Sequence, residues 1–283
     1  MADVFAVGIV GAGTMGGGLV EVAARGGHDV VLCSRSRANA EATVAAIAAG
    51  LERQIVKGRL TTDERDATLA RISVTDAVAN LADCDLVIES VVEDIATKRA
   101  LFVALDATVK PGAILATNTS TLPVVELAMA TTRPELVCGI HFFNPAATMR
   151  LVEIVQPLTA GATTIDRALA FAERCGKEPI VVADHAGFVV NALLFPYLNN
   201  AVRMAERGTA SVESIDAAMC GGCGFPMGPF ALLDLVGLDT SVAILDRLHV
   251  AFGDANYVAA PTLRRMVGEG RLGRKTGNGF YQY

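Results

Sequence analysis

The chain has 283 residues, of which 52% are hydrophobic and 19% charged, which is enough for one large or two ordinary globular domains without disulfide staples. A formal net charge of −6 at pH 7 excludes an extended nucleic-acid-binding face, so a phosphate ligand must meet a local basic cluster. Six cysteines without framework spacing, no signal-peptide pattern and no bilayer-length apolar run predict a soluble cytoplasmic protein without a membrane partner.

Strand and helix patterns alternate through the first two thirds of the chain. In chain order, we predict a strand at 4–10, a helix at 18–25, a strand at 28–33, two helices within 38–71 that break near Gly58 and restart at Thr61 or Thr62, a strand at 86–90, a helix at 94–109, strands at 113–117, 136–141 and 151–155, a helix at 163–175 and a strand at 179–182. Because strands alternate with helices, we expect an α/β domain with a doubly wound, mainly parallel sheet.

The pattern changes after Asp184, where strand signals almost disappear. Helical spacing marks residues 191–206, 211–219, 230–249 and 262–269, and glycine and proline punctuate 221–229. We therefore predict a boundary at 184–187 and two domains, residues 1–186 and residues 187–283, of which the second is all helical.

A glycine-rich segment separates the first predicted strand from the first helix. Gly11 permits a tight turn, Gly13 lets the backbone approach a pyrophosphate, and Gly16 lets the helix pack on the strand. The helix N-terminus then offers unpaired N–H groups to the phosphates. The alternative is a purely structural turn. The predicted dinucleotide-binding residues of this segment are Gly11, Gly13, Thr14, Met15 and Gly16.

The end of the second strand bears on which dinucleotide binds. An acidic residue there would bind the ribose hydroxyls of NAD, but this sequence has Ser34, Arg35, Ser36 and Arg37 instead. Arginines and hydroxyl groups suit a 2′-phosphate. We therefore expect a preference for NADP(H), with Ser34 and Arg35 as its ligands. NAD(H) remains the alternative if the arginines only form a solvated loop.

Four polar residues at strand ends and at the start of the helical region suggest the chemistry. Histidine can take a hydroxyl proton as hydride leaves, because its side chain titrates near neutral pH. His141 is such a candidate, and Glu153 is a charged residue inside an apolar strand that needs a partner. Ser120 and Asn191 can donate hydrogen bonds to a substrate oxygen.

Taken together, these motifs closely resemble the L-3-hydroxyacyl-CoA dehydrogenase family, over nearly the whole chain. The matching segments are residues 11–16, Val91-Val-Glu-Asp94 with Lys98, Asn118-Thr-Ser120, His141-Phe-Phe-Asn-Pro145, Leu151-Val-Glu153, Gly187-Phe-Val-Val-Asn191, Pro226-Met-Gly-Pro229, Asp234-Leu-Val-Gly-Leu-Asp239, Gly273-Arg-Lys-Thr-Gly277 and Gly279-Phe-Tyr281. The resemblance implies a Rossmann-type domain followed by a helical domain that closes the substrate cleft and forms a homodimer.

The resemblance also implies roles for single residues. His141 would be the general acid and base, Glu153 its orienting partner, and Ser120 and Asn191 the ligands of the 3-hydroxyl or 3-keto oxygen. Lys57 would contact a phosphate of coenzyme A. The positions that contact the cofactor would be Glu93, Lys98, Asn144 and Lys275. The implied reaction is reversible oxidation of a (3S)-3-hydroxyacyl-CoA, such as 3-hydroxybutyryl-CoA, with NADP(H) or NAD(H).

The sequence departs from the family at three places. Ser34 replaces the usual acid, Gly50 replaces a serine that helps hold coenzyme A in some members, and Ala146-Ala147-Thr148 replace bulkier residues. These changes leave open a substrate carried on an acyl carrier protein, as in polyketide precursor supply. A structural protein, a sugar-acid dehydrogenase and a dinucleotide sensor are further alternatives, which the complete quartet of Ser120, His141, Glu153 and Asn191 disfavours.

Cys220 and Cys223 have the spacing of a zinc or redox pair. A metal site needs a second pair of ligands, and local spacing supplies none. We therefore predict no metal and interpret residues 220–223 as a turn between two helices.

Overall fold

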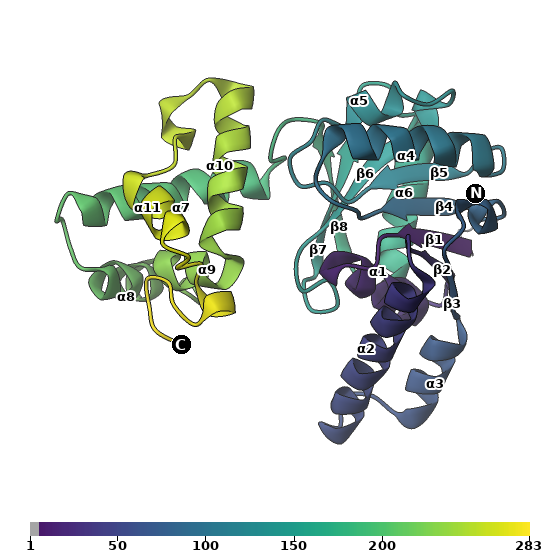
Figure 1. Cartoon of the computed structure of the whole chain (residues 1–283), viewed down its shortest axis with the longest axis horizontal. Coiled ribbons are helices and arrows are strands. Elements are labelled where there is room, and N and C mark those ends of the chain that lie inside the picture. The colour runs from purple at the N-terminus through teal and green to yellow at the C-terminus, as the bar shows by residue number, and fades with distance from the viewer. Residues whose placement is uncertain (1–5) are drawn as a thin grey trace. The chain divides into compact units, whose positions relative to one another are not determined.

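The computed structural model describes residues 6–283, so Val4 and Phe5 of the first predicted strand lie outside the described residues. The chain divides between Asp184 and His185 into two compact units, and each is described by itself. In Figure 1 the first unit runs from purple to teal and the second from green to yellow. Within residues 6–283, no helix combines the length and the apolar character that a membrane span needs.

An eight-stranded sheet with the order β3-β2-β1-β4-β5-β6-β7-β8 forms the centre of the first unit. Neighbouring strands are parallel throughout, except that β6 and β7 run antiparallel. The predicted mainly parallel, doubly wound sheet is therefore confirmed. The strands are β1 (Ala6–Val10), β2 (Asp29–Cys33), β3 (Ile72–Thr75), β4 (Leu86–Glu89), β5 (Ile114–Thr117), β6 (Val137–Phe142), β7 (Leu151–Gln156) and β8 (Glu178–Ala183).

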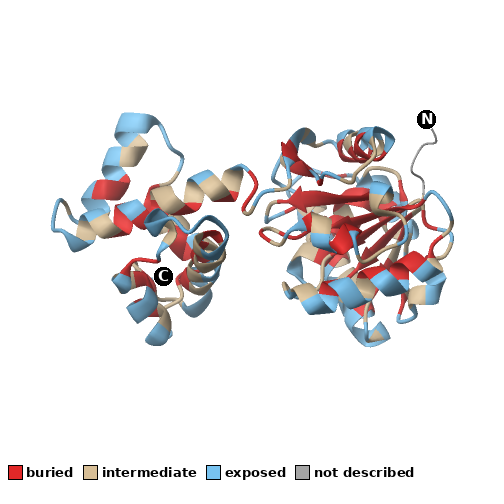
Figure 2. Cartoon of the chain, turned by 90° about the horizontal axis from the view of Figure 1, so that it is seen from above, coloured by how far each residue is buried: buried red, intermediate tan, exposed pale blue. Residues whose placement is uncertain are grey.

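The helices of the first unit cover this sheet. Figure 2 shows the strands mostly buried, and the outward faces of the helices exposed. The apolar strand runs follow from this arrangement, because a parallel strand covered on both faces has no solvent side; Val7, Ile9 and Ile88 are completely buried. The helices are α1 (Thr14–Arg25), α2 (Arg37–Val56), α3 (Thr62–Ala70), α4 (Ile95–Thr108), α5 (Val124–Ala128) and α6 (Ala162–Arg174).

Local signals explain most of these boundaries. Thr61 and Glu64 form a capping box at the start of α3, as the predicted restart at Thr61 or Thr62 requires. One strand and one α-helix were not predicted: β3 is a four-residue strand at the sheet edge, and α5 is a five-residue helix. The first backbone N–H groups of α5 donate to the carboxylate of Asp184, which is distant in sequence.

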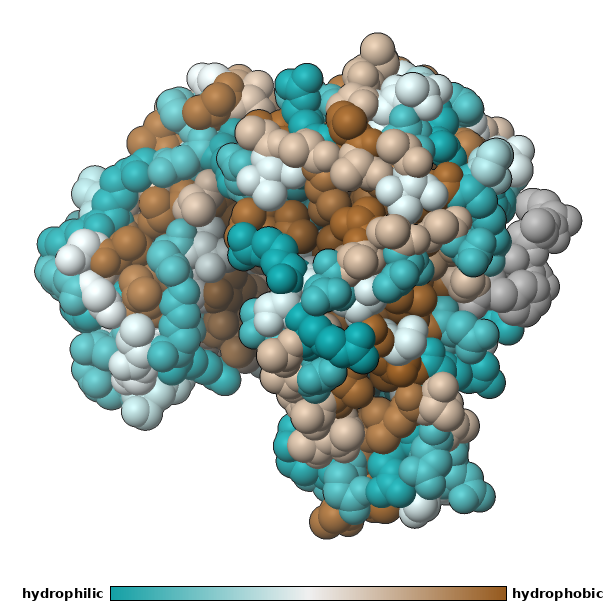
Figure 3. Space-filling view, turned by 45° about the vertical axis from the view of Figure 1, so that its right-hand side comes forward, coloured by the Kyte–Doolittle hydropathy of each residue, from teal (hydrophilic) through white to brown (hydrophobic). Residues whose placement is uncertain are grey.

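The pair α2 and α3 projects from the sheet as a lobe in Figure 1, and Figure 3 shows apolar and hydrophilic residues interleaved over this lobe. The contact between α2 and the glycine loop is polar as well as apolar. The hydroxyl of Thr43 on α2 donates to the backbone oxygen of Ala12 over 3.0 Å. The position of α2 is thereby fixed relative to the loop after β1.

The second unit consists of helices packed around their own apolar core, as the all-helical prediction requires. Its helices are α7 (Val190–Glu206), α8 (Val212–Cys223), α9 (Pro229–Val236), α10 (Leu238–Phe252) and α11 (Pro261–Gly268). Two predictions were wrong in detail. The single helix expected over 230–249 breaks at Gly237, whose φ of +100° few other residues adopt. Residues 220–223 are helical and end α8, so they are not a turn.

Two buried aspartates connect distant segments of the second unit. Asp216 accepts hydrogen bonds from the backbone N–H of Phe230 and from the hydroxyl of Tyr281. Asp234 accepts from the backbone N–H groups of Phe280 and Tyr281. These carboxylates satisfy backbone donors that would otherwise be buried without partners. The C-terminal segment is held to α8 and α9 in this way.

Candidate active site

The glycine loop, residues 11–16, lies at the carboxyl end of β1. The chain adds β2 and β3 on one side of β1 and β4 on its other side, so the order of the strands reverses between β1 and β4. Ligands of doubly wound sheets bind at such a switch point. Gly11 has φ +122°, and a Cβ atom there would lie 2.3 Å from the backbone oxygen of Ser90. A Cβ atom on Gly16 would lie 1.9 Å from the oxygen of Gly11. Both positions therefore exclude any other residue.

Gly13 differs from these two glycines, because nothing lies within 4 Å of the position a Cβ atom would take. The loop opens there to solvent at the N-terminus of α1, and Thr14 is exposed while Met15 packs partly against the core. This open backbone at a helix N-terminus fits the phosphates of a dinucleotide. A cavity of about 380 Å³ adjoins the loop between α1 and α2; its lining includes Ala12, Gly13, Thr14, Gly17, Gly18, Glu21, Thr43, Ala46, Ile47, Gly50 and Arg53.

The four residues after β2 divide into two pairs. Ser36 is the N-cap of α2 and accepts the N–H of Asn39, and Arg37 pairs with Glu41 one helical turn later. Both side chains therefore have structural partners. Ser34 is half-buried and Arg35 is exposed. Ser34 and Arg35, the two residues predicted to bind the cofactor here, follow β2 directly.

His141 and Glu153 face each other across the antiparallel pair β6 and β7, where they are direct partners in the register. His141 Nδ1 lies 2.7 Å from Glu153 Oε2, and the side chains are only 5% and 0% exposed. A carboxylate at this distance holds the imidazole ring in one orientation.

The loop after β5 carries Ser120 and is hydrogen-bonded to strand β6 and to the loop that follows β4. Asn118 Oδ1 accepts the backbone N–H of Phe142 over 2.9 Å, next to His141. Glu93 Oε1 accepts the backbone N–H of Ser120 over 3.0 Å and the hydroxyl of Thr119 over 2.5 Å. The half-buried Ser120 is therefore presented at the same edge of the sheet as His141.

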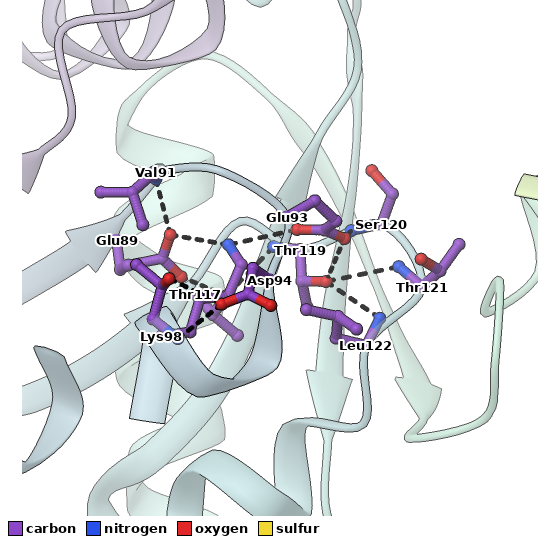
Figure 4. Close-up of polar contacts among 11 residues, drawn as sticks. Glu89, Val91, Glu93, Asp94, Lys98, Thr117, Thr119, Ser120, Thr121 and Leu122 are labelled. Atoms are coloured by element: carbon purple, nitrogen blue, oxygen red, sulfur yellow. Dashed lines mark hydrogen bonds and ion pairs between the residues drawn. The ribbon is translucent and has the colours of Figure 1, made fainter. Parts of the chain in front are cut away.

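Lys98 lies on α4 with an ammonium group that contacts two carboxylates (Figure 4). Lys98 Nζ lies 2.6 Å from Glu89 Oε1 and 3.2 Å from Glu93 Oε2. Burial alone would raise the pKa of Glu93, but Lys98 and the hydrogen bonds from Thr119 and Ser120 together lower it below its ordinary range. Sequence reasoning missed Glu89, although a charged residue that ends the apolar strand β4 is a signal of the same kind as Glu153.

The other predicted residues lie on further segments of the two units. Asn144 is exposed in the loop after β6, and Lys57 is the exposed C-cap of α2. In the second unit, Asn191 is buried in the first turn of α7, and Lys275 Nζ pairs with Asp239 Oδ2 over 2.6 Å. Arg53 was not predicted; it lines the cavity beside Gly50, one helical turn before Lys57.

Residues that could ligate a metal do not gather anywhere in residues 6–283: no three His, Cys, Asp or Glu side chains form a suitable group.

Burial raises the pKa of Cys138 to about 12 and that of Cys175 to about 12, so both stay protonated thiols at neutral pH.

Comparisons with known proteins give a consistent result for both units. Residues 6–185 match the family model of the 3-hydroxyacyl-CoA dehydrogenase NAD binding domain, and residues 187–283 match the C-terminal domain of that family. A 3-hydroxybutyryl-CoA dehydrogenase of Mycobacterium tuberculosis is 45% identical over 98% of this chain and 98% of its own length. One of Clostridioides difficile is 42% identical over 97% of this chain and 98% of its own length.

A solved structure agrees with these sequence comparisons. The crystal structure of (S)-3-hydroxybutyryl-CoA dehydrogenase from Ralstonia eutropha has a TM-score of 0.96 at 40% identity and covers 99% of both chains. The resemblance indicated by the motifs is thereby confirmed. The chain belongs to the 3-hydroxyacyl-CoA dehydrogenase family.

Proposed function

We propose that the protein catalyses the reversible oxidation of a (3S)-3-hydroxyacyl-CoA to the 3-ketoacyl-CoA with a nicotinamide dinucleotide. The observation that carries this proposal is the buried pair of His141 and Glu153 at the sheet edge beside the Ser120 loop. Relatives at 42–45% identity bear the name 3-hydroxybutyryl-CoA dehydrogenase, which favours coenzyme A over an acyl carrier protein.

His141 moves the proton in this reaction. In the oxidising direction, Nε2 takes the proton of the 3-hydroxyl group as the C3–H bond breaks and the hydroxyl oxygen becomes a carbonyl. Glu153 holds Nδ1 and stabilises the imidazolium that forms. The bound dinucleotide supplies the acceptor for the hydride. In the reducing direction, protonated His141 returns the proton to the oxygen.

Ser120 and Asn191 bind the 3-oxygen of the substrate in this proposal. Both can donate a hydrogen bond to an oxygen that gains negative charge during reduction.

The helical unit that carries Asn191 would close the substrate cleft and form a homodimer. Size-exclusion chromatography with light scattering tests the dimer, and a monomer at micromolar concentration would contradict it.

The protein binds NADP(H) in preference to NAD(H) in this proposal. The residues that support the preference are Ser34 and Arg35, which follow β2. Arg35 is exposed at the end of β2, where it can pair with a 2′-phosphate. Replacing Arg35 by Ala should lower kcat/KM with NADPH about tenfold and leave NADH unaffected. Equal effects on both cofactors, or a wild-type preference for NADH, would contradict the NADP assignment.

One assay tests the proposed function as a whole. Purified protein is supplied with acetoacetyl-CoA and with longer 3-ketoacyl-CoAs, each with NADH and with NADPH, and oxidation of the cofactor is followed by absorbance. We expect turnover with at least the short substrate. The absence of turnover with every combination would overturn the proposal.

A further inference from the structure

A buried cluster of charged side chains borders the loop that carries Ser120. Glu89 ends β4 and is 0% exposed, and Lys98 on α4 is 1% exposed. Lys98 Nζ lies 2.6 Å from Glu89 Oε1 and 3.2 Å from Glu93 Oε2. A single ammonium group therefore holds two carboxylates, one of them completely buried (Figure 4).

Glu93 connects this cluster to the Ser120 loop. Its Oε2 faces Lys98, whereas its Oε1 accepts the backbone N–H of Ser120 and the hydroxyl of Thr119. The hydroxyl of Thr119 in turn accepts the backbone N–H of Leu122 over 3.0 Å. The position of Lys98 therefore bears on the whole turn after β5, because the carboxylate that it holds is the anchor of that turn.

A second route joins Glu89 to the same loop without passing through Lys98. The hydroxyl of Thr117 donates to Glu89 Oε2 over 2.8 Å and accepts the backbone N–H of Thr119 over 3.1 Å. Glu89 Oε1 also accepts the N–H of Val91, at the start of the loop that leads to Glu93. Both oxygens of Glu89 therefore accept hydrogen bonds. The route through Lys98 and Glu93 ends on Thr119 and Ser120, and the route through Thr117 ends on Thr119.

Stability alone is a weak reason for such a cluster. A buried ion pair gains little over apolar side chains of the same volume, because removing the charges from water costs about as much as their attraction returns. The polar links of this cluster run toward the loop after β5. A network whose members are all satisfied fixes one geometry, which is what a reacting group needs.

We propose that Glu89 is a positioning residue that sets the place of the Ser120 loop through Lys98 and Glu93 and, in parallel, through Thr117. The role of Ser120 rests on the function proposed above. Glu89 itself touches neither substrate nor cofactor in this assignment.

The test is the variant Glu89→Gln, which keeps the size of the side chain and removes its charge. We expect kcat for acetoacetyl-CoA reduction to fall about 10- to 100-fold, because a misplacement of about 1 Å costs that much. Because kcat is measured at saturating NADPH or NADH, a weaker cofactor contact through Glu93 or Lys98 does not contribute to this fall. Hydrogen exchange followed by mass spectrometry should show faster exchange of the amides of residues 119–122.

Asp106→Asn is the matched control. Asp106 is also a buried carboxylate on α4, but its partners are Thr132 and Arg133. This variant should lose thermal stability while keeping kcat and the exchange protection of residues 119–122. A loss of kcat in the control as large as in Glu89→Gln would overturn the proposal, since general loosening of the unit would then explain both.

A double variant separates positioning from stability. Glu89→Gln with Lys98→Met removes the two completely buried charges, and Glu93 keeps its hydrogen bonds from Thr119 and Ser120, so part of the lost Tm should return while kcat stays low. Recovery of kcat together with Tm would overturn the positioning role, and so would wild-type kcat or wild-type amide protection in Glu89→Gln. If the wild-type protein reduces no 3-ketoacyl-CoA, the proposed function fails, and the exchange measurement still reports whether Glu89 holds the loop.

Discussion

Buried carboxylates occur in both units, and their partners differ. In the first unit, Glu153 lies against His141, and Glu89 lies against Lys98. In the second unit, Asp216 and Asp234 accept hydrogen bonds from backbone N–H groups and tyrosine hydroxyls. A buried carboxylate that accepts only from neutral donors joins distant segments of the chain. A buried carboxylate that faces an ionisable side chain near the carboxyl ends of the strands can take part in proton transfer or hold a loop that reacts.

The largest effect should follow from breaking the pair in the first unit. Glu153→Gln keeps the shape of the side chain but cannot stabilise an imidazolium, so kcat should fall by about 10² to 10⁴ while dinucleotide binding survives. Steady-state kinetics with acetoacetyl-CoA, together with a binding titration, provide the measurement. A variant with wild-type kcat would place Glu153 among the structural carboxylates and remove the distinction between the two units.

Asp234 should behave in the opposite way. Asp234→Ala leaves the N–H groups of Phe280 and Tyr281 buried without an acceptor, which should cost about 3 kcal/mol of unfolding free energy. Urea unfolding measures the loss, and kcat of the folded variant should stay close to wild type. A stable variant with a low kcat would contradict the structural role.

Glu93 sharpens the comparison through pH. Its pKa in the folded chain lies below the ordinary value of 4.5, so the folded state binds fewer protons than the unfolded state as pH falls. Its contribution to stability is therefore complete above that ordinary value and is lost as pH falls through the folded pKa. Urea unfolding of wild type and Glu93→Gln between about pH 3 and pH 7 should give a difference that shrinks toward acid pH. A constant difference would contradict the charge-based anchoring of the loop.

The smallest effect is expected at an exposed charge. Lys57→Ala should raise KM for acetoacetyl-CoA about fivefold and leave kcat unchanged, because an exposed lysine contributes about 1 kcal/mol to a phosphate contact. Lys110→Ala, at a half-buried lysine that pairs with Asp85, is the control. An unchanged KM in Lys57→Ala would weaken the assignment of the coenzyme A phosphate to the end of α2.

An element could be predicted from the sequence where its signal lies in neighbouring residues, and not where it depends on contacts between distant ones. The capping box at Thr61, the apolar strand runs and the glycine loop are local patterns, so the parallel strands β1, β2, β4, β5 and β6 were predictable, whereas the short edge strand β3 was not. The reversal of β7 was not, because an apolar run does not reveal the direction of its strand. Helix α8 continues through residues 220–223 although glycine disfavours helix, and it ends where Gly224 takes a φ of +70°.

The site shows the same division. Glu153 was conspicuous as a charge inside an apolar strand, and the antiparallel register brings His141 opposite to it. Glu89 lies one residue before the end of the strand predicted at 86–90, where a charged side chain can be expected to reach solvent. Its contact with Lys98 depends on how α4 packs on the sheet, which no spacing in the sequence reveals. Charges at strand ends therefore need the structure before a role can be inferred.

The most direct measurement is single-turnover reduction of acetoacetyl-CoA by wild type and His141→Ala, each saturated with NADPH or NADH. If His141 moves the proton, the variant should bind the dinucleotide normally and react more slowly by about 10² to 10⁴. Near-normal turnover of His141→Ala would contradict the assignment of the buried pair as the reacting site.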